Sequence, residues 1–246
     1  MRGLGTIINV VAVLVGSGVG MLVGNRLPER TRSTVTDGLG LITLIVGALN
    51  VMTIGDEAFA SAVGEDWTLI VVLGAVVGGG IIGSLLGIEP GLERIGGWMQ
   101  ARLAGDEADA ERARFIEGYV SASLLFCVGP LTILGSLSDG LGTGIDQLVL
   151  KSSLDLFASM AFAASLGLGV ALSAVSVLVF QGALTALGAG FGSFMPDSTI
   201  SAMTAAGGVL LLGIGLRLLR VRQVPVADML PALALAPLIT AVIAAW

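Results

Sequence analysis

Long apolar runs separated by short polar segments dominate the chain. The runs cover residues 4–24, 38–54, 67–88, 115–137, 148–167, 170–192, 200–219 and 227–245. Most are long enough to cross the roughly 30 Å hydrocarbon core of a bilayer as a helix. The second run is short, and the fifth and sixth nearly merge around "GLG" at 167–169. The pattern predicts an all-α, polytopic membrane helix bundle of about eight transmembrane helices, organised as a single membrane domain over residues 1–246.

The composition agrees with a membrane protein and narrows its chemistry. Hydrophobic residues make up 55% of the chain and charged residues 12%, whereas about 25% charge is usual in soluble domains. The sequence has no histidine, the commonest proton shuttle and metal ligand, so we expect no metal site, cofactor or catalytic residue. The net charge of −6 gives no sign of nucleic-acid binding. Membrane lipid, a small-molecule or ion substrate and a homo-oligomer are the partners left open.

Basic residues in the loops predict the orientation of the bundle. Cytoplasmic loops carry an excess of Lys and Arg, and the arginines follow the first, third and seventh runs. They are Arg26, Arg30, Arg32, Arg94, Arg102, Arg112, Arg114, Arg217, Arg220 and Arg222. This alternation predicts both termini outside, with Arg2 as the one residue against it. The longest loop, 89–114, has apolar residues at roughly helical spacing and is predicted to be a cytoplasmic amphipathic loop.

Two parts of the sequence resemble each other. "PERTRSTVTDGLGLITLIVG" (28–47) aligns with "PDSTISAMTAAGGVLLLGIG" (196–215), with proline, threonine, serine and glycine in register. An earlier stretch aligns Asn9 with Gln181. In the predicted topology the two parts run in opposite directions, which gives an inverted 3+3 repeat. Residues 4–88 form the first repeat, 170–246 the second, and 115–167 the central polar helices. Inverted repeats are usual in alternating-access carriers, with the site near the midplane, and they also occur in channels.

Glycines mark two predicted helix-packing faces. One face holds Gly16, Gly20 and Gly24, and the other holds Gly74, Gly78 and Gly83. Small residues at this spacing let membrane helices approach closely.

The fourth run carries an unusual polar stripe and a break. The stripe consists of Glu117, Ser121, Thr132 and Ser136, which share one face at the helical period. Pro130 follows a glycine and cannot donate to the carbonyl of Phe126. Such a break beside polar groups is expected of a discontinuous site helix. The alternative is a structural kink with hydroxyls bonded to their own helix, and for Ser121 and Ser123 taken alone the structural interpretation is favoured.

The fifth run contains Lys151, Asp155 and Ser159 on one face. An i, i+4 ion pair can neutralise itself within the helix. Lys151 is near enough to the outer interface to extend toward it. Asp155 lies about 10 Å deeper than Leu148, so it should face the bundle interior or a wet cavity. A transport-path role and a structural ion pair both remain open. Asn9 and Gln181 allow the same two interpretations, a shared central site or interhelical hydrogen bonds.

Several segments resemble the YqgA/YdfK-like family of bacterial inner-membrane proteins. They are "GTIINVVAVLVGSGVG", "EGYVSASLLFCVGPLTILGSLSDG", "KSSLDLFASMAF", "VFQGALT", "MTAAGGVLLLGIGL" and "DMLPAL". The resemblance covers nearly the whole chain and implies a polytopic protein of the bacterial inner membrane. The family's motif residues fall here on Asn9, Glu117, Ser121, Ser123, Pro130, Lys151, Asp155 and Gln181. Family members often carry Asn where this chain has Arg217, so the resemblance assigns no role to that position.

Three functions fit these observations. The favoured hypothesis is a secondary transporter for a small solute or ion, coupled to a cation or proton through Asp155. A channel lined by glycine-rich helices is the first alternative, and a membrane scaffold without transport is the second. An intramembrane enzyme is not expected, because the sequence shows no metal cluster or phosphate-binding loop. The predicted substrate or ion pathway comprises Asn9, Glu117, Ser121, Ser123, Pro130, Thr132, Lys151, Asp155, Ser159 and Gln181.

Overall fold

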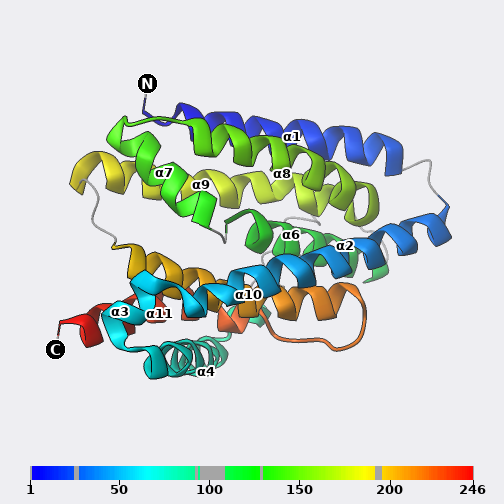
Figure 1. Ribbon diagram of the computed structural model, residues 1–246. Helices are drawn as coiled ribbons and strands as arrows, with labels where there is room; N and C mark the ends of the chain where they lie inside the picture. The colour runs from blue at the N-terminus through cyan, green and yellow to red at the C-terminus, as the bar shows by residue number, and fades with distance from the viewer. Residues whose placement is uncertain are drawn as a thin grey trace. The chain divides into compact units, whose positions relative to one another are not determined.

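The computed structural model describes residues 2–24, 28–91, 94, 109–127, 130–191 and 196–245, and over these residues the chain forms helices and no β-strand (Figure 1). The long helices are α1 (Leu4–Gly24), α2 (Glu29–Val51), α4 (Thr68–Leu86), α6 (Asp109–Cys127), α7 (Pro130–Leu141), α8 (Asp146–Leu166), α9 (Leu168–Phe191), α10 (Asp197–Leu218) and α11 (Ala232–Ala244). The short ones are η1 (Met52–Gly55), α3 (Glu57–Val63), η2 (Glu65–Trp67) and η3 (Ala227–Met229). The all-α prediction is confirmed.

Within these ranges, 7 helices are long and apolar enough to cross a membrane. Helices α6 and α7 pass the same test only as a pair, which brings the number to 8 if they form one span. The merged fifth and sixth runs separate at Gly167, between α8 and α9. This residue has a φ of +74°, which glycine adopts readily because it lacks a Cβ atom.

Polar segments that were predicted as loops contain helix. The second candidate span begins at Ser33 rather than at residue 38, and its helix α2 begins earlier still, at Glu29, so that it includes Arg30 and Arg32. Glutamate and arginine are good helix formers, so a helix can continue past the end of its apolar run. The predicted loop 89–114 likewise ends inside α6. Most of that loop, residues 92–93 and 95–108, lies outside the described residues.

Contacts divide the chain into two compact units. Unit 1 comprises residues 1–39, 92–127 and 131–194, and unit 2 comprises residues 40–91, 128–130 and 195–246. Unit 1 therefore holds α1 and α6 to α9. Unit 2 holds the C-terminal part of α2 together with α3, α4, α10 and α11. Both units combine segments that lie far apart in the sequence.

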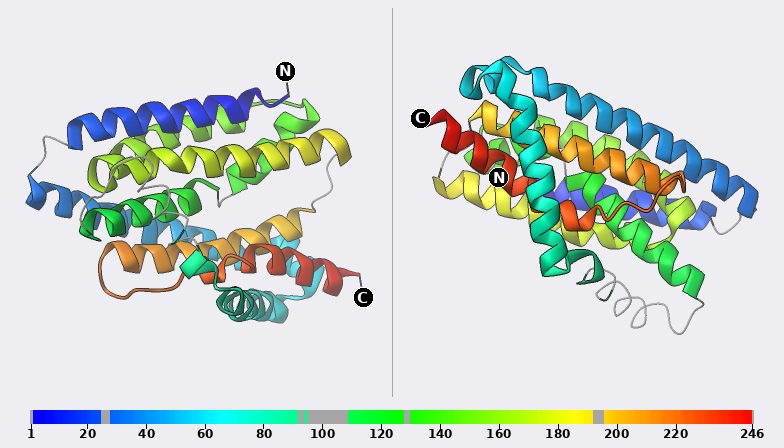
Figure 2. Two further views of the ribbon diagram at one scale, coloured as in Figure 1. Left: turned by 180° about the vertical axis from the view of Figure 1, so that it is seen from behind. Right: turned by 90° about the horizontal axis from the view of Figure 1, so that it is seen from below.

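In unit 1, a stripe of glycines lets α1 and α8 lie side by side in the same direction (Figures 1 and 2). The facing pairs are Gly16 with Leu156, Gly20 with Met160 and Gly24 with Ala164. A Cβ atom on any of these glycines would overlap the carbonyl oxygen that it faces. The backbones can approach this closely only because these Cβ atoms are absent, and the predicted packing face on α1 is confirmed.

In unit 2, glycines bring α2 and α10 together in opposite directions. The contacts are reciprocal: Gly47 lies against Gly208 and Leu212, and Gly215 lies against Gly40 and Leu44. On each helix, one glycine therefore packs against a glycine and a leucine of the other helix.

The predicted packing face on α4 is confirmed at Gly83 and wrong at Gly74, and Gly79 rather than Gly78 makes the second close contact. Nothing lies within 4 Å of a Cβ built at Gly74. The close contacts are made by Gly79, against Ala232, and by Gly83, against Asp228. Because residues 78–80 are all glycine, the sequence does not show which of them faces the neighbouring helix.

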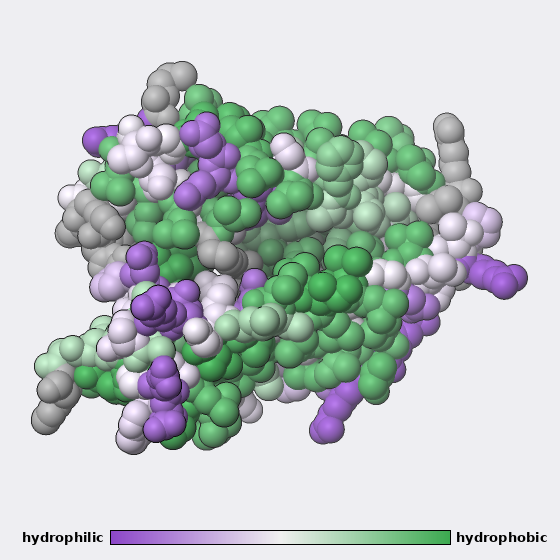
Figure 3. Space-filling view, in the orientation of Figure 1, coloured by the Kyte–Doolittle hydropathy of each residue, from purple (hydrophilic) through white to green (hydrophobic). Residues whose placement is uncertain are grey.

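Large apolar side chains cover the outward faces of the long helices (Figure 3). Leu22 is 72% exposed, Phe157 68% and Leu85 83%. Soluble monomers rarely expose contiguous apolar patches on this scale, whereas lipid-facing helices do so as a rule.

Candidate functional site

The chain turns sharply between α6 and α7, and the axes of the two helices differ by 60°. Pro130 has no N–H to donate to the carbonyl oxygen of Phe126. The hydroxyl of Thr132 donates to that oxygen instead, at 3.1 Å. Irregular backbone at membrane depth requires such a substitute partner. The structural interpretation of Thr132 is therefore favoured over a role in binding.

A charged pair lies inside unit 1, on α8. Lys151 Nζ donates to Asp155 Oδ2, and the two side chains are 7% and 10% exposed. The amide Nδ2 of Asn9, on α1, donates to the same oxygen at 3.0 Å. Asp155 faces the protein interior, as predicted. The expectation that Lys151 extends to the outer interface is wrong, because the attraction of the carboxylate holds its ammonium group inside.

Phe126 borders this pair. Its ring centroid lies 5.9 Å from Lys151 Nζ, within the range of a cation–π interaction, and the residue is fully buried. Phe126 is also the residue whose carbonyl Pro130 leaves without its usual donor. The break in the chain therefore lies directly beside the charged pair.

Gln181, on α9, lies at the same height along the helices of unit 1 as Asn9. Helix α9 runs antiparallel to α1 (Figures 1 and 2), and the hydroxyls of Thr6 and Thr185 lie 3.2 Å apart across the two helices. Asn9 follows Thr6 by three residues. Gln181 precedes Thr185 by four residues. Moving about one turn along each helix therefore brings the two amides to a common height.

Three amide atoms at this height have no hydrogen-bond partner among the described residues. They are Oδ1 of Asn9 and both Oε1 and Nε2 of Gln181. Both side chains are 0% exposed, and an unpaired buried polar group costs roughly 1–3 kcal/mol. These atoms offer donors and acceptors to a molecule that is not part of the chain. We refer to Asn9, Phe126, Lys151, Asp155 and Gln181 as the polar centre.

Ser159 and Ser121 are buried in unit 1, and the contacts of Ser159 are structural. Its hydroxyl donates to the carbonyl oxygen of Leu156 at 3.0 Å, and it lies against Gly16 in the α1–α8 contact. Ser121 is 2% exposed on α6. Glu117 is half-buried, two turns inside α6 rather than near its start.

Ser123 takes part in a short chain of hydroxyl groups between α6 and α9. It donates to Ser176 Oγ, which in turn donates to the hydroxyl of Tyr119, both at 2.9 Å. The chain begins about one turn from Phe126 and leads away from the polar centre along α6. The sequence pointed to Ser123, whereas Ser176 and Tyr119 were missed, because single hydroxyl residues in apolar runs carry no distinguishing pattern.

Asp139, on α7, was also missed. Its carboxylate accepts from the backbone N–H groups of Gly3 and Gly5 at 3.0 Å and of Thr6 at 3.4 Å. It is 1% exposed and satisfies N–H groups that the first turn of α1 leaves without intrahelical partners. The acidic residue in "SLSDG" was the available signal, although its position at the end of an apolar run suggested a loop.

Unit 2 has a separate charged cluster. Arg217 Nη1 lies 2.5 Å from Glu89 Oε1, and Glu89 Oε2 accepts from the backbone N–H of Ala227 at 2.8 Å. Asp228 Oδ1 accepts from the backbone N–H of Glu89 at 2.8 Å. The cluster ties the end of α10 and the segment before α11 to the residues that follow α4. This gives Arg217, for which the resemblance assigned no role, a structural contact.

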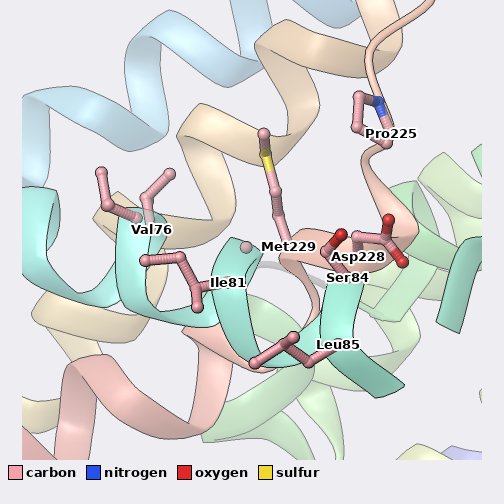
Figure 4. Close-up of a pocket in the computed structure, with 9 residues that line it drawn as sticks. Val76, Ile81, Ser84, Leu85, Pro225, Asp228 and Met229 are labelled. Atoms are coloured by element: carbon pink, nitrogen blue, oxygen red, sulfur yellow. The ribbon is translucent and has the colours of Figure 1, made fainter. Parts of the chain in front are cut away.

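An open groove of about 470 Å³ lies in unit 2 between α4 and the segment around η3 (Figure 4). Its walls are mainly apolar, with Ser84 and Asp228 as the polar residues of the lining. Asp228 already accepts a hydrogen bond from Glu89. The groove therefore presents an apolar surface rather than a polar binding site.

No cluster of three or more His, Cys, Asp or Glu side chains suited to a metal ion occurs in the described part of the chain. The single cysteine, Cys127, is buried and unbridged. The expectation that the protein needs no cofactor stays a prediction.

Comparison with known proteins identifies the family. The family described as "Protein of unknown function (DUF554)" matches residues 4–241. The chain is 33% identical over 243 residues to the uncharacterized protein YqgA of Escherichia coli (strain K12), covering 99% of this chain and 98% of that protein. It is 25% identical over 242 residues to the uncharacterized membrane protein YdfK of Bacillus subtilis (strain 168), covering 98% and 97%. No solved structure matches significantly. The family resemblance drawn from the sequence is confirmed, and the chain belongs to the DUF554 family.

Proposed function

We propose that this multi-pass membrane protein is a secondary transporter for a small solute or ion, with the polar centre as its binding site. The observation that carries the proposal is the set of unpaired amide atoms at the height of a buried ion pair, which Asn9 contacts directly. Amides that serve only to hold helices together would bond to each other or to the backbone. Here Gln181 is fully buried and bonds to neither among the described residues.

The cost of the buried charges supports the same proposal. Replacing a buried ion pair by apolar residues is often neutral or stabilises a protein by roughly 1–4 kcal/mol. Ionisable residues inside membrane segments usually mark substrate or ion pathways. The Lys151–Asp155 pair is therefore better explained by a function than by stability.

The directions of the helices support an inverted repeat. The predicted partners α1 and α9 are antiparallel in unit 1, and the predicted partners α2 and α10 are antiparallel in unit 2 (Figures 1 and 2). Helices α4 and α11 also run in opposite directions, since Gly79 faces Ala232 and Gly83 faces Asp228. The internal alignment places Gly47 on Gly215 and Gly40 on Gly208. It therefore turns the contact of Gly47 with Gly208 into the observed contact of Gly215 with Gly40, as a two-fold repeat would. Carriers with inverted repeats hold substrate at the repeat interface.

Asp155 is the proposed coupling group. It shares one carboxylate oxygen between Lys151 and Asn9. A proton or cation that binds Asp155 would release the Lys151 ammonium group from it. Occupancy of the carboxylate would in this way change the charge presented to the substrate.

We propose about eight spans in the bacterial inner membrane, both termini outside and one membrane domain, with no enzymatic activity. Membrane lipid and a small substrate are the proposed partners, without nucleic acid, and a homo-oligomer is left open.

Transport by reconstituted protein tests the function. Proteoliposomes are screened for uptake of amino acids, organic acids, sugars, polyamines and monovalent cations. Gln181→Leu removes an unpaired amide without changing charge, so we expect thermal stability to stay level or rise while uptake falls by about tenfold or more. Gln147→Leu, at an exposed position of α8, is the matched control and should leave both unchanged.

Three results would count against the proposal. Uptake that survives both Gln181→Leu and Asp155→Asn unchanged would remove the polar centre from the transport path. Absence of transport for every class of solute would reject the function. Unsaturable currents that need no gradient of a second ion would favour a channel.

A further inference from the structure

We infer that the polar centre binds a small zwitterion of the amino-acid type, with one ammonium and one carboxylate group. The inference rests on the proposed transport function and names its substrate class. It is drawn from the charge balance of the centre and from its unpaired hydrogen-bonding atoms.

The polar centre is electrically neutral. The ammonium of Lys151 and the carboxylate of Asp155 are in direct contact, and the other members are an aromatic ring and two amides. Asp139 is the other fully buried acid among the described residues of unit 1. Its charge is met by backbone N–H groups at the positive end of α1, so it does not alter this balance.

A singly charged substrate would upset the neutrality. It would bring one uncompensated charge into a site shielded from water, which is costly at membrane depth. A zwitterion brings none. Its carboxylate can take Lys151 while its ammonium takes Asp155 in exchange for the coupling proton or cation, so that one ion pair becomes two and no charge is left without a partner.

The unpaired amide atoms suit the same substrate. Oδ1 of Asn9 and Oε1 of Gln181 are acceptors that an ammonium group needs for its remaining protons. Nε2 of Gln181 is a donor for the second oxygen of a carboxylate. An uncharged solute would satisfy these amides too, but it would leave the Lys151–Asp155 pair without a part in recognition.

A set of probes matched in size separates the charge classes. Glycine carries both charges at neutral pH, glycinamide the positive one, N-acetylglycine the negative one and acetamide neither. The matching derivatives of alanine and leucine extend the set to larger side chains. With purified protein in detergent, we expect only the free amino acids to raise the melting temperature, by several degrees when they are well above their dissociation constant. Gln181→Leu should abolish the rise.

Variants of the Lys151–Asp155 pair should change which charge class of ligand the protein binds best. Lys151→Met keeps the carboxylate, so glycinamide should replace glycine as the better ligand by about tenfold. Asp155→Asn keeps the ammonium, so N-acetylglycine should gain by a similar factor. The double variant Lys151→Met/Asp155→Asn has no charge at the polar centre and provides a folded reference even where a single variant does not fold. It should lose glycine binding, while Ser153→Ala, at an exposed position of α8, should retain it.

The outcomes separate this inference from the proposed function. Glycinamide, N-acetylglycine or acetamide could instead stabilise the unmodified protein, with the effect abolished by Gln181→Leu. That result would contradict the inference of a zwitterionic substrate but would agree with the polar centre as the binding site. Failure of every amino acid to bind, or glycine binding that survives the double variant, would also overturn it. If the protein takes up a solute and neither Gln181→Leu nor Asp155→Asn changes that uptake, both the zwitterion inference and the proposed transport site are rejected.

Discussion

The two units bury polar side chains in different ways. Within the described residues, the fully buried polar side chains of unit 2 are all threonines: Thr43, Thr68, Thr199, Thr204 and Thr240. Three of them bond to a carbonyl three or four residues earlier in the chain: Thr68 to Glu65, Thr199 to Pro196 and Thr240 to Ala236. Thr204 is an exception without a partner there. Unit 1 also buries serines and threonines, but in addition it buries two acids, a lysine and two amides. The bonds of Asn9, Asp139 and Thr6 cross between helices.

The charged pairs of the two units also differ in how exposed they are and in whether neighbouring polar atoms are bonded. Arg217 and Glu89, in unit 2, have side chains 13% and 16% exposed, and Glu89 has a second donor in the N–H of Ala227. In unit 1, Lys151 and Asp155 stand beside atoms with no partner. Both units use glycine for close helix contact, so packing alone does not separate them. Among the described residues, Thr204 is the only buried polar side chain of unit 2 that lacks a partner, whereas unit 1 leaves amide atoms unpaired next to and level with a buried charged pair.

The largest expected effect comes from splitting the charged pair of unit 1. Lys151→Met leaves the carboxylate of Asp155 buried with only an amide donor, which should lower stability by about 3–5 kcal/mol. Thermal melting or unfolding in denaturing detergent measures the change. Adding Asp155→Asn should restore most of the loss, because the double variant leaves no unpaired charge at the polar centre.

Arg217→Met provides the matched change in unit 2. Glu89 keeps the Ala227 N–H and lies nearer the surface, so the expected loss is smaller, about 1–3 kcal/mol. A loss as large as that of Lys151→Met would contradict the comparison. So would a double variant in unit 1 that stays as unstable as the single one.

A second prediction compares how the units cap their helices. In unit 2, Asp56 caps α3 from the adjacent residue, at 3.1 Å from the N–H of Ala58. In unit 1, Asp139 caps α1 from a helix more than a hundred residues away in the sequence. Asp139→Ala should cost about 1.5–3 kcal/mol, since it removes a charged acceptor and leaves buried N–H groups unpaired. Asp56→Ala should cost about 1 kcal/mol.

Proteolysis and melting of the two variants check this difference. Asp139→Ala should lower the melting temperature of the whole protein, while Asp56→Ala should expose only the segment around α3 to protease. Equal losses from both variants would show that the remote cap contributes no more than the local one.

The sequence predicted the helices well because apolar length is a direct signal. The limits of α1 were predicted to the residue, since glycine and polar residues follow its apolar run at once. The start of α2 was missed because polar turns such as Glu29–Arg32 carry no apolar periodicity. On α4 the contact of Gly83 was predicted, but that of Gly79 was missed, because the consecutive glycines at 78–80 are equivalent in the sequence and differ only in what faces them.

The site was predicted in its residue types but not in its pairings. Asn9, Lys151, Asp155 and Gln181 were singled out because polar groups are rare in apolar runs, and an i, i+4 pair can be read from spacing alone. Asn9 bonds to Asp155 because α1 lies parallel to α8. The pairing of two helices cannot be predicted from the pattern of either helix alone. Asp139 was missed for the same reason, because its partners are backbone groups of α1 and carry no residue-type signal.

The smallest expected effect concerns two threonines that bond to backbone carbonyls. Thr132→Val removes the hydroxyl that replaces the missing N–H of Pro130 at the carbonyl of Phe126, and should cost about 1 kcal/mol. Thr132→Ser keeps the hydroxyl and should cost less. Melting temperatures of the two variants measure the difference.

Thr240→Val is the matched change in unit 2, where the hydroxyl bonds to the carbonyl of Ala236. That carbonyl keeps its usual donor, the backbone N–H of residue 240 itself, so valine should leave the stability unchanged within about 0.5 kcal/mol. Because Phe126 borders Lys151, Thr132→Val should also reduce transport, whereas Thr240→Val should not. Equal stabilities together with equal transport in the two valine variants would mean that the break beside the polar centre needs no more support than an ordinary helix turn.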